Sequence, residues 1–582
     1  MNVLNTTAVA YFSMEIALDV ALPTYSGGLG VLAGDTIRSA ADIGVPMTGV
    51  TLLHRKGYFT QHLDQAGTQS ESPAQWNPAD MLEQLAPRVT VEIEGRTVHV
   101  CAWRHVVRGV SGHEVPVYLL DTDLEENAAE DRRITDTLYG GDHAYRLKQE
   151  VVLGMAGAAI VHVMAPSPDR DVIHHINEGH ASLLTLTLLE RQLEGEDEWE
   201  AVSDEDIEAV RAQCVFTTHT PVPAGHDKFD IGLARRILGA ERVALLERAA
   251  AIDGHTLNMT LLALRFGRYV NAVAMRHQQV SREMFPGYEI EAITNGVHAA
   301  TWTSEPFRRL FDTHVPRWRR DNLYLRYAVK ISLDEIREAH AEAKQRLVDV
   351  VEQRARVRLD PAAMTIGFAR RSTPYKRADL IFTEPERLRE MTRRIGPVQI
   401  VFAGKAHPQD EWGKALIKHI YAAGAKIGDS VRVVYLENYD MTLGHILTSG
   451  VDVWLNNPLR PLEASGTSGM KAALNGVPSF SVLDGWWIEG HVEGVTGWSI
   501  GDDDTLPQDP SRDVFDLYRK LERVILPLYY GLPFSWAEIM RSSIALNGSF
   551  FNTQRMVTEY VNNAYRRGGP SPLVPVAMAE AD

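Results

Sequence analysis

Cysteine is almost missing from this sequence, since Cys101 and Cys214 are the only two among 582 residues. They lie far apart and form no CxxC pair, which argues against a disulfide framework and against a cysteine-based zinc site. A chain with so few thiols is typical of proteins that work in a reducing compartment.

Positive charge is also scarce, with 59 Lys and Arg against 76 Asp and Glu and a formal net charge of −17. Such a surface as a whole repels nucleic acid and anionic membranes, so we expect neither as a partner. A local cationic pocket is compatible with this net charge and would stand out against it.

A secretion signal and a long apolar run are missing at the N-terminus. The stretch MNVLNTTAVAYFSMEIALDVALP has no basic start, and Glu15 and Asp19 interrupt its apolar residues. This pattern fits neither a signal peptide nor a membrane-spanning helix. We therefore expect a cytoplasmic protein.

The chain does have length and, in its second half, a regular alternation of strands and helices. At 582 residues it is too long for one hydrophobic core, so two large domains are expected. Apolar segments predict strands at 364–369, 398–404, 431–437, 451–457 and 478–484. Helical patterns lie between them at 378–391, 410–425, 441–450 and 469–476. Such alternation predicts a parallel sheet covered on both faces.

The first half repeats the alternation less regularly. Strand patterns at 8–13 and 46–53 flank a helical pattern at 31–44. Further strand patterns lie at 171–176 and 212–218. Two Rossmann-like halves of an α/β protein are the simplest interpretation.

Turn residues in ITNGVH, at 293–298, mark a boundary between these halves. We predict an N-terminal domain over 1–297 and a C-terminal domain over 298–540. A helix within 541–567 is predicted to pack back on the N-terminal domain. The tail 568–582, rich in small residues and proline, is predicted to be disordered.

Three segments have the composition of anion-binding loops. The first, TYSGGLGVLAGD, places Gly27, Gly28 and Gly30 between a strand and a helix. Glycines there let backbone N–H groups approach an oxyanion, and the helix start adds partial positive charge. The spacing is not a full GxGxxG pattern, so a tight structural turn explains it equally well.

The second segment, ARRSTPYKRADL, follows directly on the predicted strand 364–369. It contains four cations: Arg370, Arg371, Lys376 and Arg377. Parallel sheets bind ligands at the carboxyl ends of their strands, and guanidinium and ammonium groups suit phosphate oxygens. A solvated basic loop is the alternative interpretation.

The third segment, EASGTSGMKAALNGVP, begins at Glu463 and leads through small residues to Lys471. Thr467, Ser468 and the neighbouring amides are suited to holding a phosphate. A lysine among desolvated dipoles can form a Schiff base with an aldehyde. In isolation an exposed lysine on a helix is the commoner case, but the three segments together favour a phosphate-rich cleft between two domains.

At these residues the sequence resembles the glycogen and starch (α-glucan) phosphorylases, which are pyridoxal-phosphate enzymes. Their GT-B fold has two Rossmann-like domains that face a central cleft. EASGTSGMK is similar to the motif whose last lysine carries the cofactor in that family. Other similar motifs follow in the family's order: YFSME, GGLG, RLKQE, NEGH, HTPVP, TNG, YKR, AGKAHP and LENY. The resemblance covers nearly the whole chain and implies a short, bacterial-type member.

The resemblance implies a role for each matched residue. The implied catalytic residues are Lys471, Arg371, Lys376 and His219, of which Lys471 would carry pyridoxal 5′-phosphate. Arg371 would hold the substrate phosphate, and the His219 carbonyl would face the anomeric carbon. Further cofactor contacts would come from Gly28, Trp302, Arg370, Tyr439, Thr467 and Ser468. Substrate contacts would come from Gly27, His180, Asn295, Tyr375, Glu463 and Gly466.

The implied activity is reversible, retaining phosphorolysis of terminal α-1,4-glucosidic bonds in a glucan or maltodextrin. Inorganic phosphate would be the second substrate and glucose 1-phosphate the product. The cofactor's 5′-phosphate, with an ionisation near about pH 6, would exchange a proton with the substrate phosphate. Arg371, Lys376 and backbone dipoles would offset the repulsion between the two phosphates. No metal is implied, and the family pattern favours a homodimer.

The sequence departs from the best-known family members at several positions. Thr373 and Pro374 stand in place of His-Glu, Arg370 replaces a lysine that contacts the cofactor, and Asp440 stands where arginine is frequent. Two alternatives are therefore kept: a nucleotide-sugar-dependent GT-B glucosyltransferase and a catalytically silent glucan-binding protein. Glu463 does not by itself suggest a glycosidase, because that chemistry generally needs a pair of carboxylates.

Overall fold

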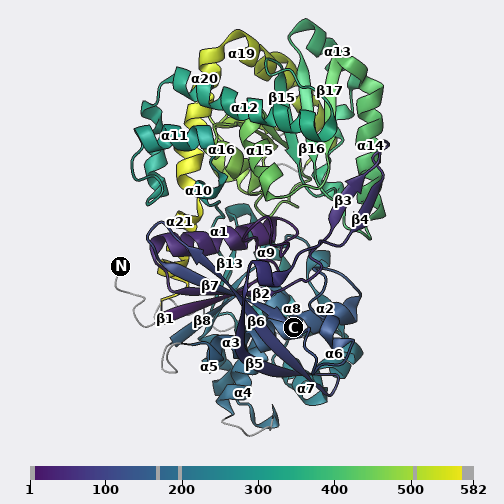
Figure 1. Ribbon diagram of the computed structural model, residues 1–582, viewed down its shortest axis with the longest axis vertical. Coiled ribbons are helices and arrows are strands. Elements are labelled where there is room, and N and C mark those ends of the chain that lie inside the picture. Colours follow the sequence, from purple (N-terminus) through teal and green to yellow (C-terminus); the bar gives the residue numbers. More distant parts are fainter. Residues whose placement is uncertain (1–6, 166–170, 194–198, 502–507, 567–582) are drawn as a thin grey trace, which may run out of the picture. The chain divides into compact units, whose positions relative to one another are not determined.

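The computed structural model describes residues 7–165, 171–193, 199–501 and 508–566. The chain forms two compact units, which the sequence colours of Figure 1 help to follow. Unit 1 comprises residues 1–58, 73–294 and 556–582, and unit 2 comprises residues 59–72 and 295–555.

This division differs from the predicted domains in two places. The segment 59–72 belongs to unit 2 although it lies within the predicted domain 1–297. Unit 2 also continues to residue 555, so the part of the predicted C-terminal segment that joins unit 1 begins only at Met556. The predicted tail 568–582 lies outside the described residues.

Unit 1 is built on a nine-stranded sheet in which seven neighbouring strands pair in parallel and the last two continue antiparallel. Across the sheet the strands are β14 (Glu291–Ala292), β13 (Tyr269–Ala272), β9 (Cys214–Thr217), β8 (Asp171–Asn177), β1 (Thr7–Phe12), β2 (Met47–Leu52), β7 (Glu114–Asp121), β6 (Arg96–Arg108) and β5 (Glu83–Ile93). From β7 to β14 the strands have the order of a doubly wound sheet. Successive strands are added on one side of β1 up to β7 and then on its other side from β8, so the switch point lies between β1 and β8. A small second sheet contains β10 (Lys228–Asp230), β12 (Thr256–Asn258) and β11 (Ile252–Asp253).

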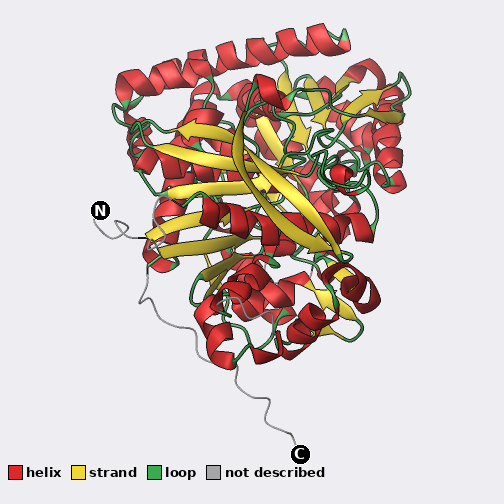
Figure 2. Ribbon diagram, turned by 60° about the horizontal axis from the view of Figure 1, so that its bottom comes forward, coloured by secondary structure: helices red, strands yellow, loops and turns green. Residues whose placement is uncertain are grey.

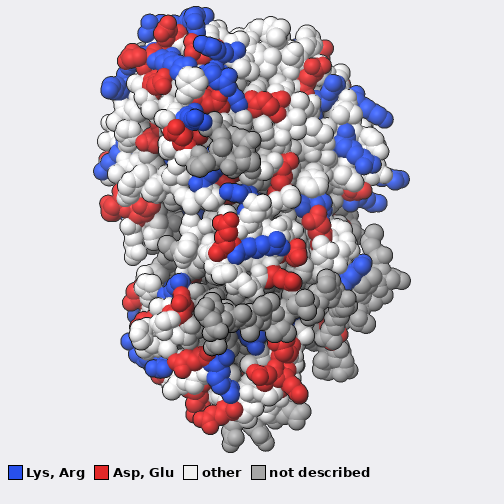
Figure 3. All heavy atoms as spheres, turned by 180° about the vertical axis from the view of Figure 1, so that it is seen from behind, with Lys and Arg blue, Asp and Glu red and all other residues white. Residues whose placement is uncertain are grey.

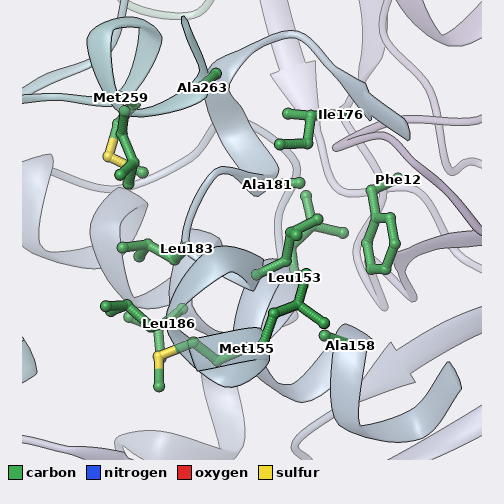
Figure 4. Packing of buried hydrophobic residues seen from close by; sticks show 14 of the residues in the cluster. Phe12, Leu153, Met155, Ala158, Ile176, Ala181, Leu183, Leu186, Met259 and Ala263 are labelled. Atoms are coloured by element: carbon green, nitrogen blue, oxygen red, sulfur yellow. The ribbon is translucent and has the colours of Figure 1, made fainter. Parts of the chain in front are cut away.

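Both faces of the nine-stranded sheet are buried under helices (Figure 2). Because side chains alternate along a strand, β1 sends Ala10 and Phe12 into one core and Val9 and Tyr11 into the other. In the first core, residues such as Leu153 and Leu183 pack with Phe12 (Figure 4). The helices of unit 1 are α1 (Gly28–Ile43), α2 (His143–Val151), α3 (Gly157–Val163), α4 (Leu184–Gln192), α5 (Asp204–Arg211), α6 (Ile231–Leu238), α7 (Ala240–Arg248), α8 (Met259–Phe266), α9 (Met275–Met284) and most of α21 (Thr553–Asn563).

Unit 2 contains a six-stranded, fully parallel sheet. Its strands are β17 (Val431–Leu436), β16 (Val398–Ala403), β15 (Met364–Ala369), β18 (Val453–Asn456), β19 (Ser479–Val482) and β20 (Gly497–Ile500). In chain order this is 3-2-1-4-5-6, the Rossmann order, with its switch point between β15 and β18. The five strands predicted for this half are all present, and β20 was not predicted.

Helices cover the six-stranded sheet of unit 2, and α12 is the longest of them. Its start at Ser332 is a capping box with Glu335, and it ends before Arg356 in a left-handed conformation. The helices of unit 2 are α10 (Ala299–Trp302), α11 (Glu305–His314), α12 (Leu333–Ala355), α13 (Pro385–Arg394), α14 (Glu411–Ile427), α15 (Met441–Gly450), α16 (Ser468–Leu474), α17 (Trp487–Gly490), α18 (Pro510–Lys520), α19 (Leu526–Gly531) and α20 (Pro533–Ser542).

A hairpin from the first tenth or so of the chain completes unit 2. Its strands are β3 (Thr60–Leu63) and β4 (Gln69–Ser72). The Gln61 side chain donates to the Gly404 carbonyl at 3.0 Å, and the Gln69 side chain donates to the Ala406 carbonyl at 2.8 Å. Lys405 donates to the Phe59 carbonyl at 2.9 Å. The hairpin is thus bonded to the loop that follows β16.

Charged side chains of both signs are intermixed on the face shown in Figure 3. Within the described residues, none of the helices has the length and apolar composition needed to cross a membrane.

Candidate active site

The loops that carry most of the predicted site residues of unit 2 leave its sheet at the switch point. One loop follows β15 and contains Arg370 to Arg377, and the other follows β18 and leads through Glu463 to α16. Crevices outside the carboxyl ends of strands at such a point are the usual ligand sites of open α/β sheets.

Glu463 is the centre of a buried charge cluster formed by these two loops. Its Oε2 atom accepts hydrogen bonds from Arg370 Nη2 and from Lys376 Nζ, each at 2.5 Å. Burial alone would raise the pKa of the Glu463 carboxyl, but the charges of Arg370 and Lys376 lower it to about 2. The carboxyl is therefore ionised at neutral pH.

Lys376 is the second strongly perturbed group of this cluster. Burial, followed by the charge of Arg370, lowers the pKa of Lys376 to about 7, against the opposing effect of Glu463. Its Nζ lies 4.4 Å from the centroid of the Tyr375 ring. The exposed Arg371 also lowers the pKa of Lys376. Arg370, Arg371, Tyr375 and Lys376 thus act electrostatically on one another, as expected for an anion site.

Arg377 differs from the other cations of its segment. Its guanidinium is buried and donates to Asp513 at 2.7 Å and to the carbonyls of Asn457 and Pro458. This arginine ties the loop after β18 to α18, so one of the four cations grouped by sequence has a structural position.

A line of polar side chains crosses the strand ends behind Glu463. Arg370 Nη1 donates to Asn456 Oδ1, and Asn456 Nδ2 donates to Ser481 Oγ at 3.0 Å. The Glu463 backbone amide donates to Asp484 at 2.9 Å. The carboxylate and its backbone are therefore held from β15, β18 and the end of β19.

Lys471 lies in α16 and is buried rather than exposed. Its Nζ is 3.7 Å from the centroid of the Trp302 ring, a cation–π contact with a fully buried indole. The interpretation of Lys471 as an ordinary surface lysine is therefore wrong. A desolvated ammonium of this kind matches the setting in which lysines react with aldehydes.

The segment before Lys471 has the features of a ligand cradle. Gly466 has φ +83°, and a Cβ there would approach Glu463 Oε1 to 3.3 Å. The buried Ser465 Oγ has no hydrogen-bond partner within the described part of the chain. Ser468 Oγ accepts from Trp454 Nε1 at 3.0 Å, and Thr467 is the N-cap residue of α16 without a side-chain cap bond. An orphaned hydroxyl beside buried cations fits a phosphate-bearing cofactor.

Two further predicted residues lie in unit 2. Asn295 is buried, and its Oδ1 has no partner among the described residues, as expected of a group that binds a ligand hydroxyl. The Tyr439 ring packs against the core that contains α12 and α15, and burial raises the pKa of its phenol.

Of the departures from the family pattern, Asp440 and Pro374 have local structural explanations. Asp440 is the N-cap of α15 and accepts from the Leu443 amide at 2.7 Å. Pro374 occupies the first position of a short 3₁₀ helix, Pro374–Lys376, where proline is favoured. The buried hydroxyl of Thr373 has no partner within the described residues.

The glycine loop of unit 1 is organised by Glu15. Its carboxylate accepts from the amides of Ser26 at 2.5 Å and Gly27 at 3.0 Å. A Cβ at Gly30 would lie 2.7 Å from the same carboxylate. The Gly27 amide thus already has an acceptor in Glu15. The space beside Gly28 is open, because a Cβ added there would meet nothing within 4 Å.

His219 of unit 1 is held by the residues that end β8. Its backbone amide donates to Glu178 at 2.9 Å, and its Nε2 lies 2.6 Å from Asn177 Oδ1. Burial lowers the pKa of His219 to about 3, so the ring is neutral at pH 7. Glu178 has φ +68° and ψ 162°, a region nearly restricted to glycine, which is typical of functional sites.

His180 lies two residues beyond Glu178, and its Nε2 is 3.4 Å from Asp227. Asp227 also accepts from Arg146 at 2.9 Å, and the Arg146 guanidinium lies 4.5 Å from the Tyr139 ring centroid. Burial, then the Arg146 charge, lowers the pKa of His180 to about 3. The RLKQE and NEGH motifs thus meet in one polar cluster of unit 1.

Sequence reasoning missed several residues of these clusters. Asp484 ends a predicted strand, and Asn456 lies near the end of another. These positions at the carboxyl ends of predicted strands are the signal that could have identified both residues. Ser465 stands inside the motif already singled out. Glu178 carried no separate signal, because its backbone conformation is visible only in the structure.

The chain is similar to known proteins over most of its length. Residues 240–494 match the family model described as carbohydrate phosphorylase. The maltodextrin phosphorylase of Thermococcus litoralis is 40% identical over 96% of this chain and 70% of its own length. The glycogen phosphorylase of Mycobacterium tuberculosis is 36% identical over 96% of this chain and 71% of its own length.

The glycogen phosphorylase of Aquifex aeolicus is 35% identical over 96% of this chain and 86% of its own length. Together with the two sheets of Rossmann order, these similarities confirm the predicted α/β class and GT-B type of fold. The chain belongs to the carbohydrate phosphorylase family.

Proposed function

We propose that this protein is an α-glucan phosphorylase that uses pyridoxal 5′-phosphate bound to Lys471. The substrates would be a glucan or maltodextrin and inorganic phosphate, and the product glucose 1-phosphate with retained configuration. The relatives named glycogen and maltodextrin phosphorylases support this substrate class. The observation that carries the cofactor assignment is the burial of Lys471 against Trp302 at the end of a Ser/Thr/Gly-rich loop.

The cofactor would supply a phosphate group that exchanges a proton near neutral pH. Lys471 would hold its aldehyde carbon, and Trp302 and Tyr439 would lie beside its ring. Its phosphate would be bound by Lys376, Arg370, Thr467, Ser468 and the Gly28 amide.

Positive charge and a fixed carboxylate would define the substrate side of the site. Arg371, the exposed guanidinium of the loop after β15, would bind the substrate phosphate. Arg370 and Lys376 would reduce the repulsion between two neighbouring phosphates. Because the pKa of Glu463 is about 2, its carboxylate cannot donate a proton at neutral pH and would instead accept hydrogen bonds from sugar hydroxyls.

Neutral side chains would contact the sugar without adding charge. The sugar hydroxyl groups would be bound in unit 2 by Asn295, Gly466 and Tyr375. In unit 1 they would be bound by His180. His219, whose lowered pKa keeps it neutral, would direct its backbone carbonyl towards the anomeric carbon, where positive charge develops.

The test is chemical labelling of the lysine. The purified protein is reduced with borohydride and digested, and the peptide that carries a pyridoxyl group is identified by mass spectrometry. We expect the label on Lys471, its loss together with activity in Lys471→Ala, and its retention in Lys405→Met, which changes a half-buried lysine of unit 2. Protein that takes up no cofactor but transfers glucose from a nucleotide sugar would contradict the proposal.

A further inference from the structure

The side chain of Asn475 joins three backbone groups near the candidate cofactor lysine. Its Nδ2 donates to the Trp302 carbonyl at 2.8 Å and to the Lys471 carbonyl at 3.0 Å. Its Oδ1 accepts from the Ser304 amide at 2.7 Å. The side chain is fully buried, and both of its N–H donors and its oxygen are hydrogen-bonded to backbone atoms.

The Asn475 side chain supplies hydrogen-bond donors to carbonyl groups in the last turns of two helices, α10 and α16. The Asn475 backbone amide donates to the Ala472 carbonyl at 2.9 Å, and its side chain provides a bond to Lys471. Trp302 is likewise the last residue of α10, where a carbonyl has no partner within the helix. One amide therefore links the ends of α10 and α16.

Lys471 and Trp302 also contact each other through their side chains. Lys471 Nζ lies 3.7 Å from the Trp302 ring centroid, and both side chains are buried. Lys471 and Trp302 are thus connected twice, once through the Asn475 amide and once by the cation–π contact. A shift of either backbone would change the height of the amine above the ring.

We propose that Asn475 is a positioning residue that sets the Lys471 amine against the Trp302 ring for attachment of the cofactor. The inference rests on the proposed function, because it assigns a role towards the cofactor held by Lys471. Asn475 acts through the backbones of two residues that would touch the cofactor.

The sharpest variant is Asn475→Asp, which keeps the size of the side chain and an acceptor for the Ser304 amide. It removes both amide donors and places carboxylate oxygens beside two carbonyls. We expect the cofactor to leave the loaded protein at least tenfold faster than from the wild type. The measurement is the decay of cofactor absorbance during exchange into a scavenger, together with the borohydride-fixed label on Lys471.

Asn322→Asp is the matched control. Asn322 is also buried in unit 2 and donates to a tryptophan carbonyl, that of Trp318, at 2.8 Å. It has no bond to α16, so Asn322→Asp should lower the melting temperature and leave the rate of cofactor release unchanged. A release rate that rises equally in both variants would assign Asn475 a general structural role and overturn the proposal.

A double-mutant cycle tests the route through Trp302. If Asn475 acts by placing the indole, Trp302→Leu and Asn475→Asp together should release the cofactor no faster than the more severe single variant. Multiplicative effects of the two substitutions on the release rate would contradict this route.

Ser304→Pro gives a second route if Asn475→Asp yields no folded protein. The φ of Ser304 is −69°, which proline adopts, so the substitution removes the N–H that donates to Asn475 without requiring a new φ, at the cost of replacing the serine hydroxyl by a ring. Cofactor release at the wild-type rate would overturn the inference. Wild-type protein without any pyridoxyl label would overturn the proposed function and this inference together, whereas a labelled wild type with unaffected variants overturns the inference alone.

Discussion

Single residues of the charge cluster in unit 2 have fixed protonation states that decide their roles. Glu463 receives Arg370 and Lys376 on the same oxygen, which keeps it ionised far below neutral pH. A carboxylate held this way can orient hydroxyl groups but cannot act as an acid. A buried charge without its partner would be costly, so the three side chains depend on one another.

Replacing Glu463 by Gln should separate cofactor binding from catalysis. The amide keeps the size of the side chain but loses the charge that pairs with Arg370 and Lys376, and it weakens hydrogen bonds to sugar hydroxyls. We expect kcat/KM for glucose 1-phosphate to fall by about 10²-fold or more, equivalent to roughly 3 kcal/mol. Steady-state kinetics measures this loss, and the pyridoxyl label on Lys471 should persist.

Glu493→Gln is the control for this experiment. Glu493 also pairs with a lysine of unit 2, Lys520, at 2.7 Å. Its loss should change stability with little effect on kcat/KM. Equal kinetic losses in the two variants would contradict the assigned role of Glu463.

The sequence motifs identify the charged residues of the candidate site, but not the residues that position them. Lys471, Lys376 and Glu463 belong to motifs, so their chemistry is visible in the sequence. Asn475 was not predicted, because an asparagine that follows a helix usually serves only as its end. Only the three-dimensional contacts relate it to Trp302, which is 173 residues away.

At the level of elements, the five strands of unit 2 were predictable because each is a short apolar run bounded by turn residues. The antiparallel edge of unit 1, β5 and β6, was missed. Its signal is the alternating pattern on both sides of Glu94 and Gly95, which have φ +54° and +70° and form the hairpin turn. Glutamate at such a position is uncommon, which hides the turn.

The cap of α15 gives a prediction at this scale. Asp440→Arg places the residue frequent in the family at a position where the side chain accepts from the Leu443 amide. It should destabilise unit 2 by about 1 kcal/mol, because the capping bond is lost. Denaturant unfolding measures the change. Asp440→Asn keeps a capping oxygen and should cost much less, and a larger loss for Asn than for Arg would contradict this explanation.

For the molecule as a whole, unit 1 carries an acid-sensitive interior. Burial lowers the pKa of six of its described histidines to about 3 or 4: His54, His174, His175, His180, His219 and His277. The unfolded chain takes up these protons below about pH 6.5 and the folded one does not, so stability falls with acidification. The loss is about 2 kcal/mol for each such histidine at pH 5.

Acidification from pH 7.5 to 5 should therefore loosen the sheet of unit 1 first. Hydrogen exchange followed by mass spectrometry should show β1 and β8 losing protection before β15 and β16. His174→Asn should make the pH dependence shallower, whereas exposed His419→Asn should leave it unchanged. Earlier loss of protection in unit 2 would contradict this prediction.

The assignment of residues 59–72 to unit 2 and of Met556 onwards to unit 1 has a consequence for synthesis on the ribosome. The β3–β4 hairpin emerges more than 200 residues before the rest of its unit, a wait of roughly 10–45 s at 5–20 residues per second. Tyr560 and Tyr565, which complete one core of unit 1, emerge after every strand of its nine-stranded sheet. Unit 2 cannot finish folding before residue 555 has been made, and unit 1 cannot finish before Tyr560 and Tyr565 have followed, so the nascent chain exposes apolar surface to chaperones throughout this time.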